Sequence, residues 1–273
     1  MTLHAASREA LGFAETRLDE VLGDAGTDPS AVGEELLSVV GLLTREVGLR
    51  RAVGDGSSDP EARTRLVRTL LQSKVSEPAL QVLDAVVGSR WSSPRELLDG
   101  LESVGQTALL TSAEKSGKLD TVEDELFRIA RIVDREPELE RALSDRVGPV
   151  EGKRTLIRNL TADKVDPVTR ILVEQVVVRP RGRSIAIGID ELVKLAAARR
   201  DRSVAYVTSA TELTAEQRDR LAAKLAQIYG RPVVLHVELN RAIGAGLVVR
   251  VGDEVIDGSA AGRIEALRRQ LAS

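Results

Sequence analysis

The chain repeats part of itself at a fixed distance of 90 residues. Of the 56 positions from 32 to 87, seventeen hold the same residue as the position 90 further on. The densest group is Arg45, Glu46, Leu49, Arg51 and Ala52, which recurs as Arg135, Glu136, Leu139, Arg141 and Ala142. Self-similarity at a fixed period marks a structural unit that occurs more than once. We therefore expect two copies of one domain, at residues 1–105 and 106–202.

Each copy carries apolar residues at helical spacing. Steps of three and four residues place side chains on one face of an α-helix. The first copy has Val32, Leu36, Val39 and Leu43, and the second has Val122, Leu126, Ile129 and Val133. Only 2% of the residues are aromatic, so the cores must be built from Leu, Val, Ile and Ala. We expect two bundles of short helices, with grooves in which an amphipathic partner helix can lie.

Several dipeptides predict where helices begin. Pro is favoured in the first turn of a helix, after a capping Ser or Asp. Ser93-Pro94, Asp59-Pro60 and Asp166-Pro167 fit this pattern. Glu96 stands three residues after Ser93, which is the spacing of a capping box, in which two side chains reciprocally bond the first-turn amides.

A different pattern begins at residue 203. Ser203 to Ser209 is rich in β-branched residues and predicts a strand, and so does Val233 to Leu239. Between these strands, Thr214 and Gln217 have capping-box spacing ahead of a helix that carries Leu221, Leu225 and Ile228.

The end of the chain predicts a hairpin and a last helix. Gly252-Asp253 is a turn pair between residues 247–251 and 254–256. A helix is then expected through Ile264, Leu267 and Leu271. The predicted fold class is therefore α+β: two tandem all-α helical bundles, followed by a small β-α-β-β-α domain at residues 203–273.

The composition disfavours several classes of function. Lys and Arg total 39 and Asp and Glu 42, a net charge of -3 that is too balanced for a generic nucleic-acid binder. There is no cysteine, and His4 and His236 are the only histidines, so neither a thiol nucleophile, a His-based triad nor a multi-histidine metal site can be built. Apolar stretches such as 171–178 fall far short of the ~20 residues that cross a bilayer. We expect no nucleic-acid partner and no direct membrane insertion.

Three further features have ordinary interpretations. Gly244-Ala245-Gly246 precedes a strand, whereas a phosphate-binding glycine loop follows one and opens a helix, so no cofactor is predicted. The run Arg179 to Arg183 is interpreted as a solvated basic loop, and Trp91 as a single packed indole.

The string from Gly246 to Ser259 resembles the carboxy-terminal part of the delta subunit of F-type ATP synthases, the relative of mitochondrial oligomycin-sensitivity-conferring protein. Residues 113–119 and 122–126 look like the amino-terminal bundle of this family, and the resemblance covers about residues 107–273. It marks as structural positions Gly246, Gly252, Asp253, Asp257, Gly258 and Ser259.

Two features depart from the common family pattern. The usual glycine pair before the hairpin is Ala245-Gly246 here, so the turn geometry can differ. The first copy is extra relative to the short form, and looks like the duplicated bundle of actinobacterial delta proteins.

The resemblance implies a non-catalytic stator subunit of the proton-translocating ATP synthase, without cofactor or metal. The helical part is expected to hold the amino-terminal helices of the alpha subunits, and the α/β domain the carboxy-terminal helices of the b subunits. Its place would be peripheral, at the cytoplasmic face of the cell membrane. Two alternatives remain at this point: a generic helical adaptor for amphipathic peptides, and an enzyme using Asp253 and Asp257.

Overall fold

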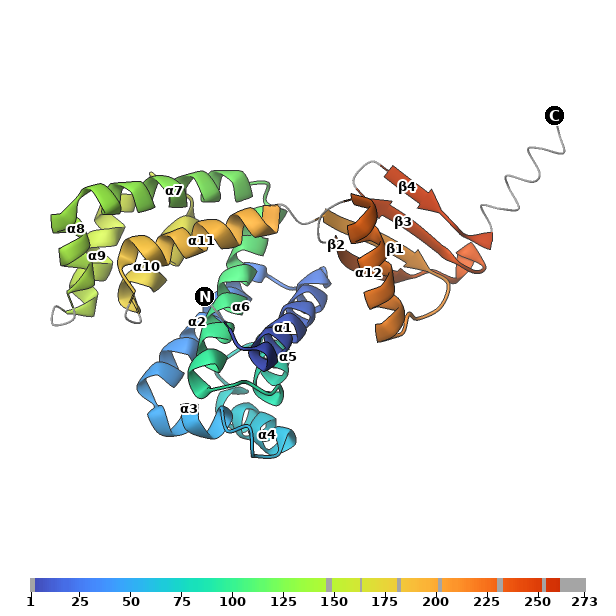
Figure 1. Cartoon of the computed structure of the whole chain (residues 1–273), viewed down its shortest axis with the longest axis horizontal. Helices are drawn as coiled ribbons and strands as arrows, with labels where there is room; N and C mark the ends of the chain where they lie inside the picture. The colour runs from blue at the N-terminus through green and yellow to red at the C-terminus, as the bar shows by residue number, and fades with distance from the viewer. Residues whose placement is uncertain are drawn as a thin grey trace. The chain divides into compact units, whose positions relative to one another are not determined.

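A computed structural model describes residues 3–145, 149–162, 164–180, 183–200, 203–229, 233–251 and 254–260. The chain divides into two compact units, residues 1–197 and 198–273. The first is helical and the second combines a sheet with a helix, as Figure 1 shows. The α+β fold class is confirmed.

The described part of the first unit is built from helices alone. They are α1 (Ala5–Gly23), α2 (Pro29–Arg45), α3 (Val47–Val53), α4 (Pro60–Leu71), α5 (Glu77–Gly88), α6 (Pro94–Lys115), α7 (Leu119–Arg135), α8 (Pro137–Ser144), α9 (Val150–Thr161), α10 (Pro167–Val178) and α11 (Ile185–Arg200).

The helices repeat with the same 90-residue period as the sequence. Moving α2, α4 and α5 by 90 residues gives the bounds of α7, α9 and α10. By the same shift α1 matches α6, and α6 itself matches α11. The two series of helices therefore overlap, because α6 ends the first and begins the second. The predicted division at residues 105/106 falls inside α6, and the three-part domain organisation stays a prediction.

The helix starts follow the predicted caps, with one correction. Asp59, Ser93 and Asp166 each accept a hydrogen bond from a backbone N–H in the first turn of α4, α6 and α10. The capping box at Ser93 is incomplete, because the Glu96 carboxylate contacts the backbone N–H and ring Nδ1 of His4, at 3.2 and 2.6 Å. This partner lies 92 residues away in sequence and could not be read from local spacing.

The predicted apolar stripes lie in two cores. Val32, Leu36, Val39 and Leu43 are buried in a core that also holds Trp91, whose indole Nε1 donates to the Val86 carbonyl at 2.7 Å. Val122, Leu126 and Val133 are buried in a second core, against which Ile129 packs half-buried. The helical period of the stripes and the packed indole are thus confirmed.

Two polar contacts also recur at the 90-residue shift. Glu35 on α2 accepts from the N–H and hydroxyl of Ser76 before α5, and Glu125 on α7 accepts from Asp166 N–H before α10 and from the Thr169 hydroxyl. Each carboxylate thereby anchors the start of a neighbouring helix. Because the two carboxylates occupy matching places, the copies share tertiary contacts as well as helix bounds.

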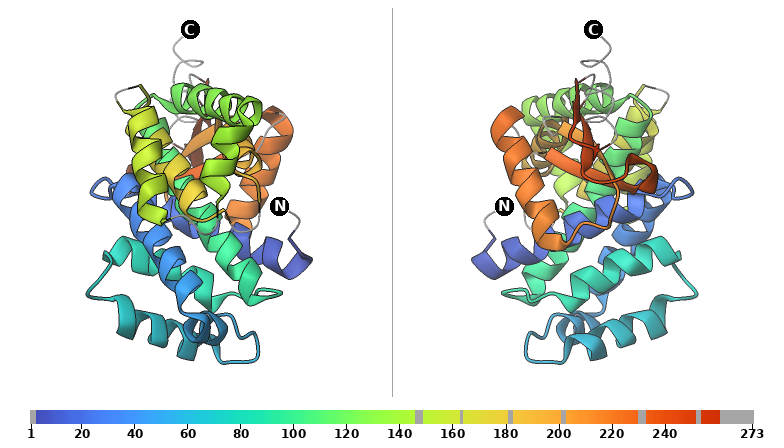
Figure 2. Two further views of the ribbon diagram at one scale, coloured as in Figure 1. Left: turned by 90° about the vertical axis from the view of Figure 1, so that its left-hand side faces the viewer. Right: turned by 90° about the vertical axis from the view of Figure 1, so that its right-hand side faces the viewer.

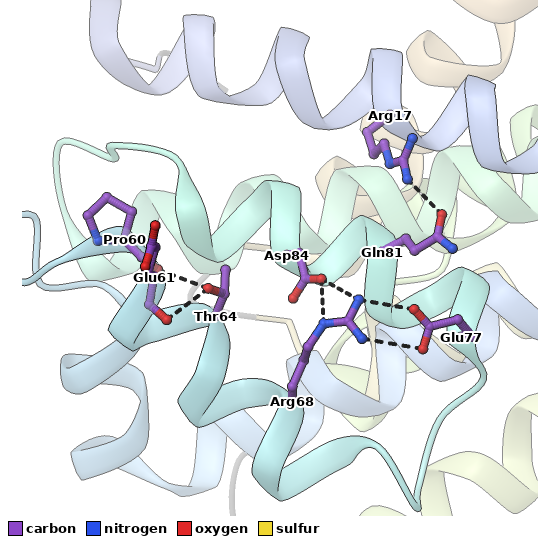
Figure 3. Close-up of polar contacts among 8 residues, drawn as sticks. All are labelled: Arg17, Pro60, Glu61, Thr64, Arg68, Glu77, Gln81 and Asp84. Carbon is purple, nitrogen blue, oxygen red and sulfur yellow. Dashed lines mark hydrogen bonds and ion pairs between the residues drawn. The ribbon is translucent and has the colours of Figure 1, made fainter.

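The second recurring contact ties α4 to α5. Figure 3 shows Arg68 between Asp84 and Glu77, with its Nε 2.7 Å from Asp84 Oδ2. The hydrogen bond with Asp84, followed by that with Glu77, raises the pKa of Arg68. In the second copy Arg158 reaches Glu174 on α10 at 3.0 Å, the equivalent pair.

Close helix packing joins the two copies within the first unit. A Cβ on Gly33 of α2 would lie 2.8 Å from Leu109 Cγ on α6, so a larger residue does not fit there. Arg179, just after α10, donates to the Leu37 carbonyl at 2.8 Å. The prediction of a solvated basic loop is therefore wrong for this residue.

The same correction holds for Arg183. Its guanidinium pairs with Glu191 on α11 and, at 3.4 Å, with Glu102 on α6. Glu102 is buried, and this contact links α6 to the second series of helices. Sequence patterns could not find Leu37 or Glu102 as partners, because they lie 142 and 81 residues away from Arg179 and Arg183.

The second unit is a four-stranded sheet with one helix in its described part. The strands are β1 (Ser203–Ser209), β2 (Val233–Leu239), β3 (Leu247–Val251) and β4 (Glu254–Asp257), and the helix is α12 (Ala215–Tyr229). The strand order is β2-β1-β3-β4, with β1 and β2 parallel and β3 antiparallel to both β1 and β4.

The helix α12 lies against one face of this sheet (Figures 1 and 2). Leu225 packs there with Val207 and Val249. The capping box is complete, since Gln217 N–H donates to Thr214 Oγ1 and Thr214 N–H to Gln217 Oε1. The predicted strands, helix and hairpin are confirmed, whereas the turn pair Gly252-Asp253 and the last helix lie outside the described residues.

Candidate partner-binding surfaces

The first candidate surface is on α1 and α5. Phe13 on α1 is 60% exposed, which is unusual for a large aromatic side chain. One turn on, Arg17 donates to the Gln81 side chain of α5 at 2.7 Å and fixes the two helices side by side (Figure 3). A fixed pair of helices with an exposed ring is suited to contact a further helix.

A second kind of surface lies where α4 meets α2 and α3. An apolar pocket there is lined by Val39, Leu42, Leu43, Leu49, Val67, Leu70, Leu71, Leu83 and Val87. Leu70 at its edge is exposed, and so is Leu66 one turn earlier. In the second copy, Leu160 is exposed at the position that matches Leu70, whereas Leu156, which matches Leu66, is half-buried.

The third candidate surface is the sheet face opposite the core of the second unit. Tyr206, Arg250 and Val255 stand in one row across β1, β3 and β4. The Arg250 guanidinium lies 5.2 Å from the centre of the Tyr206 ring, within range of a cation–π interaction. All three side chains are exposed in the described structure.

The described motif residues form a tight turn around the start of β3. Gly246 has a φ of 86°, a left-handed conformation that L side chains rarely adopt. A Cβ at this position would also lie 2.4 Å from the Gly258 carbonyl oxygen. Gly258 N–H donates to the Leu247 carbonyl at 2.9 Å, so the two glycines bring the backbone segments together.

Asp257 closes this turn. Its Oδ1 accepts hydrogen bonds from the N–H and the hydroxyl of Ser259, at 2.8 and 2.6 Å. The bond from the Ser259 hydroxyl, and then that from its N–H, lower the pKa of the Asp257 carboxyl. The carboxylate is thus used in a local backbone contact, while Gly252 and Asp253 lie outside the described residues.

Neither a metal site nor a membrane-spanning helix is present among the described residues. In the ranges that the structure describes, no three His, Asp or Glu side chains gather as a metal site would require. No described helix is both long enough and apolar enough to span a membrane.

Comparison with known proteins identifies the family. The family described as ATP synthase delta (OSCP) subunit matches residues 106–271, more than half of the chain. The chain belongs to this family. The delta subunit of Streptomyces griseus is 44% identical over 99% of this chain and 100% of its own length, and that of Nocardia farcinica is 47% identical with the same coverage.

The match to these relatives includes the first copy of the helical repeat, which the family description leaves out. A chain of the Toxoplasma gondii mitochondrial ATP synthase hexamer is 20% identical and covers 62% of this chain and 95% of its own, but its TM-score of 0.28 is too low to support an argument. As a member of the delta family, this chain is a non-catalytic component of the ATP synthase stator, or peripheral stalk, and its partners are other subunits of that complex.

Proposed function

We propose that the chain joins the catalytic head of the synthase to its peripheral stalk through two separate ends. The helical unit binds amino-terminal helices of the alpha subunits, and the sheet unit binds carboxy-terminal helices of the b subunits. The complex holds the chain at the cytoplasmic face of the cell membrane. The central shaft then rotates against a fixed head, so that its torque is coupled to ATP synthesis.

One observation carries this proposal: each compact unit has its own core and its own exposed apolar surface. A linker that bears load needs a separate attachment at each end. The two contacts act in series, so the linker stays attached only as long as its weaker contact lasts. Slow dissociation of each contact and linkage among several contacts both prolong attachment. Exposed apolar side chains on helices and on a sheet face supply such surfaces.

The three-part division stays part of the proposal. Residues 1–105 and 106–202 would be the two bundles of the head-binding part, and residues 203–273 the stalk-binding domain. In that domain, Gly246, Asp257, Gly258 and Ser259 act as structural positions that hold the turn before β3 against the end of β4.

The experiment is a pair of titrations with the full-length chain. A peptide of the alpha amino-terminal helix and a segment of the b carboxy-terminal helix are added separately, and binding is followed by calorimetry. Phe13→Asp is expected to weaken alpha-peptide binding by about tenfold or more, since a charge replaces an apolar anchor worth roughly 1.5–3 kcal/mol, while leaving b binding unchanged.

The reciprocal variant is Val255→Asp, which is expected to weaken only b binding. Failure of either segment to bind, or loss of both interactions with one substitution, would contradict the two-ended linker. A generic helical adaptor would also bind a scrambled amphipathic peptide of equal composition, and the linker would not.

A further inference from the structure

The equivalent helices α2 and α7 differ on one face. Both keep the apolar stripe toward their own core, with Val32 and Leu36 recurring as Val122 and Leu126. A second face is formed by positions four residues apart, which lie on one side of a helix. On α2 these positions are Gly33, Leu37 and Gly41, and on α7 they are Glu123, Phe127 and Arg131.

The second face of α2 forms the joint between the two copies. Leu37 is fully buried and belongs to the core of the second copy, although α2 is part of the first. Its equivalent Phe127 is 48% exposed. Gly33 lies so close to Leu109 of α6 that even a Cβ would clash, so a glutamate as large as Glu123 does not fit there. This face is therefore adapted to a contact that α7 does not make.

Arg179 closes the joint from the second copy. It follows α10, and its Nη1 donates to the Leu37 carbonyl at 2.8 Å. A Cβ on Gly41 would lie 2.8 Å from the Nη2 of Arg179, so the glycine leaves the space that the guanidinium fills. The first copy has Ser89 at the matching place, and its hydroxyl donates to the Ala85 carbonyl of its own helix. The arginine is thus specific to the joint.

These contacts add a second line of attachment to the shared helix. The helix α6 contributes to both cores and extends through both groups of helices (Figure 1). Two bodies joined by one helix alone can bend about it, because long helices are rarely straight. The contact of Arg179 with α2 lies off α6 and opposes such bending. The pair of Arg183 with the buried Glu102 also fixes the start of α11 to α6.

We infer that the joint is rigid, so that the two copies act as one lever, and that Arg179 is the residue that prevents bending about α6. The use of the lever rests on the proposed function, in which the chain transmits force. The first copy, which the family description does not cover, then holds the exposed surface of α1 and α5 at a fixed distance from the second copy. Force applied to one copy passes to the other without loss in the joint.

Distances between spin labels in the full-length chain test the joint. The chain has no cysteine, so Thr69→Cys and Asn159→Cys, exposed at matching places on α4 and α9, carry one label each. Pulsed electron resonance is expected to give a single narrow distance distribution. Arg179→Ala should broaden it by about twofold or more, because a hinge motion of the two bodies adds to the spread.

Gly41→Ala gives the same loss without removing a charge. Its Cβ displaces the guanidinium, while alanine favours the helix α2. The two substitutions together should broaden the distribution no more than either one, because they remove the same contact. The matched control is Arg158→Ala, which removes the contact with Glu174 inside the second copy and should leave the width unchanged. Circular dichroism verifies that each variant is folded.

The outcomes separate the joint from the proposed function. A broad distribution in the unaltered chain would overturn the rigid lever. An unchanged width in folded Arg179→Ala and Gly41→Ala, or equal broadening by Arg158→Ala, would overturn the role of Arg179. Because the labels report on the chain alone, a narrow distribution in a chain that binds neither partner segment would refute the proposed function and support the rigid joint.

Discussion

Replacing Gly100 by Ala tests the packing of the first bundle at its tightest point. Gly100 lies on α6, and a Cβ there would stand 2.1 Å from Cη2 and 2.4 Å from Cζ3 of the Trp91 ring. The ring is 5% exposed and its Nε1 donates to the Val86 carbonyl. It therefore cannot move aside without losing that hydrogen bond or displacing its neighbours.

The magnitude follows from three contributions. Overpacking a core costs about 1–3 kcal/mol, and loss of the indole hydrogen bond costs about 1 kcal/mol. Alanine favours the helix over glycine by about 1 kcal/mol and offsets part of this. We expect a net loss of about 2 kcal/mol in the free energy of unfolding.

The matched control is Gly12→Ala on α1. Gly12 is also inside a helix, but no atom outside its neighbourhood comes within 4 Å of a Cβ placed there. The same substitution is therefore expected to stabilise the chain by about 0.5–1 kcal/mol.

Urea unfolding, followed by circular dichroism and by fluorescence, measures both variants. Trp91 is the only tryptophan, so the fluorescence reports this site directly. With an m-value of about 2 kcal/mol/M, the midpoint for Gly100→Ala should fall by about 1 M. If both glycine variants were stabilised alike, with unchanged fluorescence, the packing of Trp91 on α6 would be refuted.

Three further predictions concern the turn at β3 and the repeated carboxylates. Ser259 lowers the folded-state pKa of Asp257 from 3.8, so the stability that this carboxylate contributes is present above pH 3.8 and is lost as the pH falls through the folded-state pKa. Ser259→Ala should raise the pKa of Asp257 in a carboxyl NMR titration, and an unchanged pKa would refute the contact. Gly246→Ala should destabilise the sheet unit by about 2 kcal/mol or more, because this position has a positive φ and an added Cβ would clash with the backbone. Amide hydrogen exchange in the sheet should become faster, and unaltered exchange would contradict this geometry. Glu35→Ala and Glu125→Ala should each lower the free energy of unfolding, measured with a chemical denaturant, by about 2 kcal/mol, because each removes two hydrogen bonds to a carboxylate. A large loss from only one of the two variants would show that the copies are not stabilised by the same contact.

Local sequence patterns predicted the helices and strands but not the contacts between residues far apart in the chain. The stripe from Val32 to Leu43 and the capping box of Thr214 and Gln217 depend on residues within one helix, so spacing alone was sufficient. The partner of Arg179 lies 142 residues away, and only the folded chain brings the two together.

The repeat predicted two copies but not how they are joined. The 90-residue period indicates a tandem pair, whereas the helix bounds show that α6 takes part in both series. A helix can do this because its opposite faces pack into different cores: Leu101 lies in the first and Leu110 in the second. Apolar spacing in the sequence identifies one buried face of a helix, so it does not reveal that a helix packs into two different cores.

The candidate surfaces were the least predictable part. Exposure of Leu70 or Tyr206 depends on which neighbours the fold places over them, and apolar residues in a stripe are more often buried.

The most direct test of the account is ATP-driven proton pumping by membrane vesicles from cells that lack this chain. The amount of head bound to the membrane is measured in parallel by immunoblot. If the chain is the link that resists rotation, vesicles that retain the head should hydrolyse ATP without pumping, and adding back the purified chain should restore pumping. Undiminished pumping in vesicles that retain the head but lack the chain would contradict the account.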